Sequence, residues 1–139
     1  MVWSSKYMTG NAIVDNDHKQ IFALVKDVLD QKFDTREKKI DSVIDFLARY
    51  TAKHFDNEEK LMDECNYVKS AEHKKQHTDF LAEVGRLQAK IAKEGTKDID
   101  ISIVVNDTVV TWLVQHVLGS DKLLADFYRD WQAKARKGM

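Results

Sequence analysis

The sequence contains no proline, a single cysteine and only five glycines among its 139 residues. Proline is the strongest helix breaker, so its absence leaves long helices uninterrupted. The lone cysteine, Cys65, cannot form an internal disulfide and is typical of proteins from a reducing compartment. These absences predict a helical protein that is stabilised by packing rather than by covalent cross-links.

An excess of charge of one sign is also absent, because 22 Lys and Arg residues balance 23 Asp and Glu residues. Such a surface lacks the basic patch that binds nucleic acid or an anionic membrane. No apolar run approaches the roughly 20 residues of a membrane span, and Met1–Gly10 lacks the basic and apolar regions of a signal peptide. We therefore expect a cytoplasmic protein without nucleic-acid or membrane partners, and the sequence indicates no particular protein partner.

What is present is the composition of one globular domain, with 43% apolar and 32% charged residues. Four stretches carry core-type side chains spaced alternately by four and three residues, which is the period of an amphipathic helix. The four stripes are His18, Phe22, Val25, Leu29; Ile40, Ile44, Leu47, Thr51, His54, Glu58, Leu61, Cys65; His73, His77, Phe80, Val84, Leu87, Ile91; and Val105, Val109, Trp112, His116. Asp34–Glu37 resembles a capping box before the second stripe, and Lys93–Gly95 resembles a helix stop after the third.

Helices that are joined by short connections must run alternately up and down. The sequence therefore predicts an all-α fold, a single domain over residues 1–139 whose up-down-up-down four-helix bundle occupies residues 15–118. Residues 1–14 lack a clear period and are predicted to form an extended N-terminal arm packed on the bundle. Residues 119–139 carry a shorter amphipathic stretch, which predicts a short C-terminal helix.

All the histidines of the chain lie on the predicted inward faces of these helices, together with Glu58. A single inward histidine is more often a hydrogen-bonded structural residue than a metal ligand. Burying several imidazoles and a carboxylate in one bundle is costly unless a common partner satisfies them. A metal site is the simplest such partner, and its candidate histidine ligands are His18, His54, His73, His77 and His116.

The positions of these residues along the bundle test the metal hypothesis. In an antiparallel hairpin, two residues that are equally far from the turn lie at the same level. His18 and His54 are equally far from the predicted turn at Asp34–Arg36. His77 and His116 are equally far from the predicted turn at Gly95–Lys97. The candidate ligands are therefore expected to meet in one layer of the bundle.

Local spacing also suits chelation. The pairs His54-x-x-x-Glu58 and His73-x-x-x-His77 each place two ligands one turn apart on a single helix face. A second carboxylate, Asp121, joins them if the chain bends at the glycine that precedes it. The remaining acids near Glu58 are interpreted as the solvated face of the second helix; they are Glu59, Asp63 and Glu64.

The ligand types narrow the choice of metal. Structural zinc sites prefer four ligands and often thiolates, whereas calcium and magnesium prefer oxygen ligands. Five imidazoles and two carboxylates exceed one octahedron but suit two octahedral ions that share bridging carboxylates. Iron is the first choice for such a site, and manganese and cobalt remain open on chemistry alone.

Taken together, these residues resemble the hemerythrin family, specifically the single-domain bacteriohemerythrins. The resemblance spans residues 3–121 and fills all the ligand positions of the family. The matching motifs are Trp3 with Gly10 and Val14-Asp15-x-x-His18; His54-Phe55-x-x-Glu58-Glu59-x-x-Met62; Tyr67 and His73-x-x-x-His77-x-x-Phe80; and Trp112-Leu113-x-x-His116-Val117-x-x-x-Asp121. The chain departs from the family at Leu124, where members often have a tyrosine.

The resemblance implies a non-haem centre of two iron ions with an oxo or hydroxo bridge, which binds O2 reversibly and takes NO or azide as analogues. By this likeness, the residues that bridge the irons are Glu58 and Asp121. One ion is completed by His73, His77 and His116, and the other by His18 and His54. The second ion then has one protein ligand fewer, so O2 is expected to bind end-on there.

The donor set favours an oxygen carrier, store or sensor over an enzyme. Neutral imidazoles dominate it, whereas the di-iron oxidases of ferritin-like bundles use more carboxylates. Apolar side chains beside the ligands are expected to form the wall of the O2 pocket; they are Phe55, Trp112, Leu113 and Leu118. Two alternatives remain open at this stage: a di-iron redox enzyme that reduces peroxide or nitric oxide, and a module for iron storage or delivery.

Overall fold

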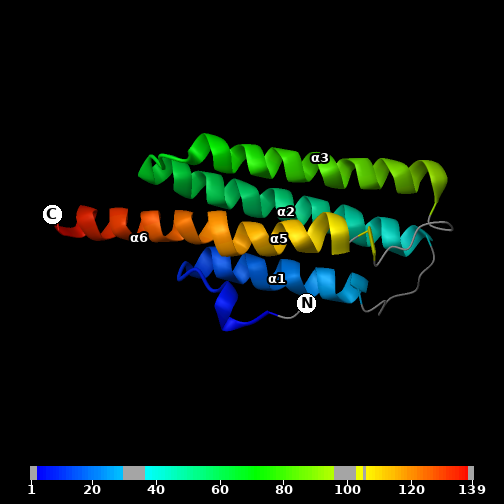
Figure 1. Ribbon diagram of the computed structural model, residues 1–139, viewed down its shortest axis with the longest axis horizontal. Coiled ribbons are helices and arrows are strands. Elements are labelled where there is room, and N and C mark those ends of the chain that lie inside the picture. The colour runs from blue at the N-terminus through cyan, green and yellow to red at the C-terminus, as the bar shows by residue number, and fades with distance from the viewer. Residues whose placement is uncertain (1–2, 30–36, 96–102, 105, 138–139) are drawn as a thin grey trace.

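The computed structural model describes residues 3–29, 37–95, 103–104 and 106–137, and these form helices without any strand. After a short 3-10 turn, η1 (Ser5–Tyr7), come α1 (Ala12–Leu29), α2 (Glu37–Cys65) and α3 (Ser70–Glu94). The last run comprises η2 (Asn106–Val110), α5 (Thr111–His116), η3 (Val117–Asp121) and α6 (Lys122–Lys137). Figure 1 shows the runs side by side with alternating directions, so the predicted all-α bundle is confirmed.

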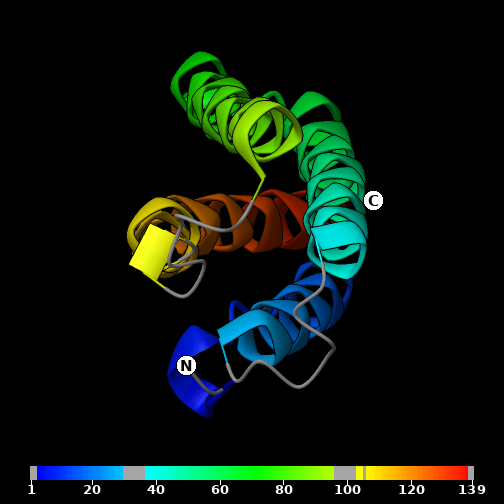
Figure 2. The same ribbon diagram turned by 90° about the vertical axis from the view of Figure 1, so that its right-hand side faces the viewer.

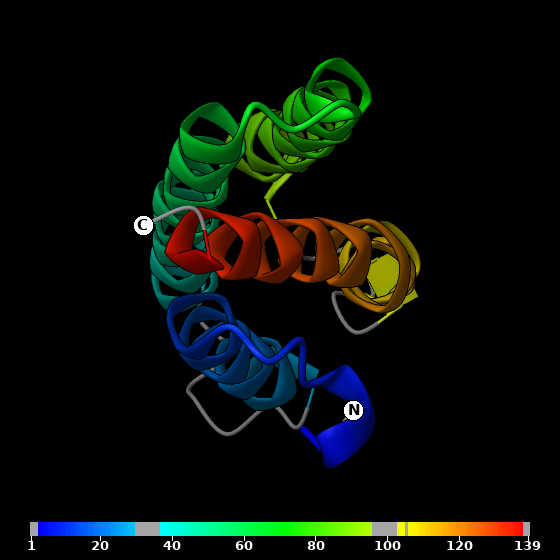
Figure 3. The ribbon, with the colours of Figure 1, turned by 90° about the vertical axis from the view of Figure 1, so that its left-hand side faces the viewer.

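The end-on views show how the helices enclose the interior. In Figure 2, α3, α2 and α1 form an arc, and the run of α5 and α6 lies on its open side and extends toward α2. In Figure 3, α6 leans across the end of the bundle toward α2. No helix in the part of the chain that the structure describes is both long and apolar enough to cross a membrane.

The buried faces follow the predicted stripes closely. The buried residues of α3 are the six residues of its stripe, from His73 to Ile91. In α2, Met62 is buried whereas Leu61 is only half-buried, because the inward face continues four residues beyond Glu58. The predicted capping box lies mostly outside the described residues, as does Val105.

The helix ends show why the chain turns where it does. Asn66, directly after α2, adopts a left-handed φ of 52°. Gly95, directly after α3, has a φ of 73° and donates its N–H to the carbonyl of Ile91. Glycine adopts this region without a Cβ clash. The predicted stop at Lys93–Gly95 is therefore confirmed.

The N-terminal arm packs on α1 through polar and aromatic contacts. The buried carboxylate of Asp15 accepts hydrogen bonds from the backbone N–H and the hydroxyl of Thr9, both at 2.8 Å. The rings of Trp3 and Tyr7 pack against Phe22, with centroids 5.2 and 4.8 Å apart. The arm thus lies beside His18, whose ring is 6.4 Å from that of Trp3.

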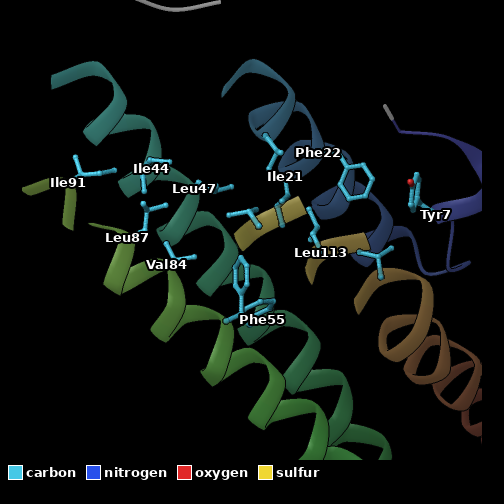
Figure 4. Close-up of a cluster of buried hydrophobic side chains, with 14 residues drawn as sticks. Tyr7, Ile21, Phe22, Ile44, Leu47, Phe55, Val84, Leu87, Ile91 and Leu113 are labelled. Atoms are coloured by element: carbon cyan, nitrogen blue, oxygen red, sulfur yellow. The ribbon is translucent and has the colours of Figure 1, made fainter. Parts of the chain in front are cut away.

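Two hydrophobic clusters lie on either side of the predicted histidine layer. The larger cluster, drawn in Figure 4, runs from Tyr7 and Phe22 to Ile91. The smaller cluster comprises Met62, Cys65, Tyr67, Leu124 and Tyr128. Leu124, the departure from the family pattern, is fully buried there and fills its position with apolar volume. The two clusters hold the helices together above and below the polar layer.

Cys65 is expected to be structural rather than reactive. It is 3% exposed in the smaller cluster, and burial raises the pKa of its thiol, so the thiol stays protonated at neutral pH. Cys65→Ala should lower the free energy of unfolding by about 1 kcal/mol through lost packing. Metal analysis and absorption spectra should show unchanged iron content and an unchanged O2 spectrum; a change in either would assign the thiol a role at the site.

Candidate metal centre

The structure brings all seven predicted ligand residues into one buried layer. They come from α1, α2, α3, α5 and η3, and no side chain among them is more than 4% exposed. Their potential ligand atoms form two groups, each with atoms within 4.8 Å of one another. The first group is Glu58, His73, His77, His116 and Asp121, and the second is His18, His54, Glu58 and Asp121. Glu58 and Asp121 belong to both groups.

Asp121 enters the layer by a route that differs from the expected bend. Five residues are about 1.4 turns of an α-helix, which would turn Asp121 away from His116. The segment between them, η3, is π-helical, and its wider turn brings residues five apart onto the same face. Asp121 Oδ1 consequently lies 2.9 Å from His116 Nε2. The helix continues through this turn into α6, so no bend is needed.

The Nε2 atoms of the three-histidine group converge closely. His116 Nε2 is 3.1 Å from His73 Nε2 and 3.2 Å from His77 Nε2. Two nitrogens that bind one metal at about 2.1 Å and at right angles lie about 3.0 Å apart. The spacing of the imidazoles therefore suits octahedral coordination.

Hydrogen bonds on the outer side of the rings fix their tautomers. His77 Nδ1 donates to Glu59 Oε2 at 3.2 Å, and His116 Nδ1 donates to Gln76 Oε1 at 2.8 Å. A neutral imidazole that donates through Nδ1 carries a lone pair on Nε2. The two Nε2 lone pairs therefore face each other, which is unfavourable unless a cation lies between them.

The second group has the same character. His54 Nδ1 donates to Asp17 Oδ2 at 2.9 Å, so its Nε2 lone pair faces Glu58 Oε1 at 3.4 Å. Both oxygens of Glu58 and Nδ1 of His18 are buried without a hydrogen-bond partner, and His18 Nε2 lies 2.9 Å from Asp121 Oδ2. Buried polar atoms are rarely left unpaired. This donor set fits a pair of metal cations that share Glu58 and Asp121.

Burial and mutual repulsion set the protonation of the layer. Burial, together with the neighbouring His116 and His73, lowers the pKa of His77 to about 2, so it is neutral at pH 7. Burial and the nearby Asp121 raise the pKa of Glu58 well above its ordinary value. Burial alone would raise the pKa of Asp121, but His116 and several hydrogen bonds hold it well below its usual range. Neutral imidazole is the form that binds metal.

Comparison with known proteins agrees with this geometry. The family model described as the hemerythrin HHE cation binding domain matches residues 9–128. The chain belongs to the hemerythrin family. A bacteriohemerythrin of Pseudomonas aeruginosa strain PAO1 is 30% identical over 129 residues, which is 93% of this chain and 82% of that protein. The myohemerythrin of Sipunculus nudus is 32% identical over 116 residues, 84% of this chain and 83% of that protein.

A third relative matches this chain over nearly the whole of the relative's own length. The bacteriohemerythrin of Clostridium acetobutylicum is 29% identical over 131 residues, 90% of this chain and 98% of that protein. The resemblance read from the motifs of the sequence is therefore confirmed at the level of the hemerythrin family.

Three hydrogen-bond partners of this hemerythrin-family site were not found by sequence reasoning. Asp17 and Gln76 received no assignment, and Glu59 was interpreted as part of a solvated face. The structure corrects the interpretation of Glu59, which accepts a hydrogen bond from His77. Each of the three directly precedes or follows a ligand residue in the chain. A polar residue next to a ligand on the same helix was the available signal, because neighbours flank the inward face.

The predicted pocket residues have different surroundings. Phe55 stacks on His77, with ring centroids 3.8 Å apart, and Trp112 stacks on His116 at 4.3 Å. Leu113 is buried in the larger hydrophobic cluster. Leu118 is instead 38% exposed, so it does not form a buried wall. Its neighbour Val117 takes the inward position on η3.

Without metal, this hemerythrin-family protein should lose stability on acidification. Below pH 6.5 the unfolded chain protonates His54 and His77, whose pKa values burial lowers in the fold. Glu58 has the opposite effect on stability above pH 4.5. There its carboxyl group keeps a proton in the folded chain but not in the unfolded chain, so acidification favours the fold. The raised pKa of the half-buried Glu59 acts in the same direction as that of Glu58, but less strongly. The two histidines outweigh these carboxyl groups, so the free energy of unfolding should fall as the pH falls from 6 to 5.

Urea titrations of the metal-free protein at several pH values measure this slope directly. A stability that stays constant or rises between pH 6 and pH 5 would show that the histidines are protonated in the fold. Such a result would contradict the neutral imidazole layer.

Proposed function

We propose that this protein holds two iron ions with an oxo or hydroxo bridge and binds O2 reversibly, as a carrier, store or sensor rather than as an enzyme. The observation that carries the proposal is the shared layer, in which Glu58 and Asp121 lie within reach of both histidine groups. Membership of the hemerythrin family also supports it. The buried free thiol of Cys65 supports a cytoplasmic location for this function.

The proposed ligand assignment follows the two groups. Glu58 and Asp121 would each supply ligand atoms to both ions. The histidines of one ion are His73, His77 and His116, and those of the other are His18 and His54. The tautomers support it, because Nδ1 of His54, His77 and His116 is engaged on the outer side and Nε2 faces inward.

The surroundings favour binding of O2 over its use in oxidation. Iron held by these residues would supply the electrons for reversible binding of O2. His54, His77 and His116 present unprotonated Nε2 atoms to the layer. The apolar rings of Phe55 and Trp112 stack on His77 and His116 and keep water from them. The di-iron oxidases that form high-valent iron use more carboxylate ligands than the two in this layer.

Iron content and absorption spectra test this proposal. The purified protein should contain two irons per chain, and its spectrum should change on exposure to air after reduction and revert when O2 is removed. Irreversible oxidation with steady turnover of peroxide or nitric oxide in the presence of an electron donor would favour the redox enzyme. Many irons per chain would favour the storage module.

The position of an added ligand is a second expected outcome. The His18 and His54 group has one histidine fewer than the other, so azide should bind the ion of that group. A crystal structure of the azide adduct measures this position. Azide on the ion of His73, His77 and His116, or placed symmetrically between the ions, would contradict the assignment.

A further inference from the structure

The outer hydrogen bonds of the three oriented histidines are not chemically alike. His54 and His77 donate to the carboxylates of Asp17 and Glu59. His116 donates instead to the amide oxygen of Gln76, at 2.8 Å. The shortest of the three contacts is therefore made to the one acceptor that carries no charge.

Gln76 is held in the orientation that presents its oxygen. The same Oε1 atom accepts a second hydrogen bond, from the hydroxyl of Ser120, also at 2.8 Å. A flipped amide would place its NH2 group against the Nδ1–H of His116 and lose both acceptor contacts. Ser120 lies four residues beyond His116, on η3, so the amide of Gln76 bridges α3 to two residues of the last helical run.

The charge of the acceptor changes what a histidine ligand does. A carboxylate acceptor makes a metal-bound imidazole a stronger donor, which stabilises the more highly charged metal. A neutral amide orients the ring in the same way but adds less basicity. Asp17 and Glu59 therefore favour ferric iron, and Gln76 limits this effect.

We infer that Gln76 is a positioning residue that fixes His116 as the Nδ1–H tautomer and, by being neutral, keeps the iron centre reducible enough to remain in the O2-binding state. This inference rests on the proposed function, because it concerns the same ions. It adds a specific cause for resistance to oxidation, located at one side chain outside the ligand set.

The surroundings of Gln76 allow a clean substitution. A surface cavity of about 250 Å³ is lined by Gln76, Trp112, Gln115, His116, Gly119 and Ser120. A carboxylate at position 76 can remain solvated on this side, so Gln76→Glu preserves shape and adds one charge. Gln115 is exposed on the same cavity and has no contact with Nδ1 of His116 among the described residues. Gln115→Glu is therefore the matched control for charge alone.

The main experiment compares the iron-loaded full-length protein with these two variants. Gln76→Glu should raise the ratio of ferric to ferrous iron at a fixed potential about tenfold, which is a fall of about 59 mV in a one-electron potential. Its oxidation in air should accelerate by a similar factor. Gln115→Glu should change either quantity less than twofold. Equal shifts in both variants, or no shift in Gln76→Glu, would overturn the inference.

A zinc-loaded sample separates this inference from the proposed function. Nitrogen-15 NMR should show the proton of His116 on Nδ1 in the wild type and in Gln76→Glu. Gln76→Leu should weaken zinc binding by about tenfold or more, since it removes the acceptor, and Gln76→Glu should restore it. Unchanged zinc affinity in Gln76→Leu would overturn the positioning role. If the wild type takes up zinc in this way but binds no O2 when loaded with iron, the proposed function and the redox role of Gln76 are both refuted. The assignment of the His116 tautomer to Gln76 would still stand.

Discussion

Removing the metal from this protein is expected to lower its melting temperature by at least about 10 °C. Three buried ligand atoms have no hydrogen-bond partner in the fold, namely Nε2 of His54 and both oxygens of Glu58. Each such atom costs about 1 kcal/mol or more when nothing satisfies it. The sum is at least about 3 kcal/mol, and the melting temperature of a domain of this size shifts by about 3 to 4 °C per kcal/mol.

Calorimetry of the iron-loaded and chelator-treated protein measures this difference. Adding iron back to the treated sample is the control, because recovery of the higher melting temperature excludes chemical damage. One ion per chain, or identical melting of the two forms, would contradict the prediction of a two-ion layer.

The bundle and most of the ligand layer were predictable from the sequence, because both follow the helical spacing of the inward-facing side chains. The inward stripe of α3 contains both its ligands and its apolar core residues, from His73 to Ile91, and all six are buried. Hydrophobic spacing therefore placed His73 and His77 as surely as it placed Phe80. The shared level of His77 and His116 followed from the turn at Gly95, whose positive φ the backbone confirms.

The parts that escaped prediction depend on distances rather than on period. Asp121 shares a face with His116 only because η3 is π-helical, and hydropathy spacing carries no mark of a wider turn. The tautomers depend on which acceptor lies behind each ring. Asp17 and Gln76 come from helices other than those of the histidines they contact, so no local spacing could pair them.

Glu58→Gln is expected to abolish stable binding of both ions. Glu58 Oε1 lies within 3.9 Å of the Nε2 atoms of four histidines, the nearest being His77 at 3.1 Å. Glutamine keeps the shape of the side chain but removes the charge and replaces one acceptor with a donor. Iron per chain should fall well below one, and the O2-dependent spectrum should disappear. Glu72→Gln, an exposed position on α3 next to His73, is the matched control and should retain two irons.

The same substitution should stabilise the metal-free protein while it destroys the site. Burial and the nearby Asp121 raise the pKa of Glu58, so ionising it in the fold is unfavourable. A neutral amide avoids this penalty and should raise the free energy of unfolding by about 1 kcal/mol at pH 7. It also removes the larger of the two contributions that oppose His54 and His77 on acidification, the smaller being the raised pKa of Glu59. Stability should therefore fall more steeply between pH 6 and pH 5 than in the wild type. Urea titrations would refute this account if the variant kept the wild-type slope, because Glu58 would then be ionised in the fold like an ordinary carboxylate.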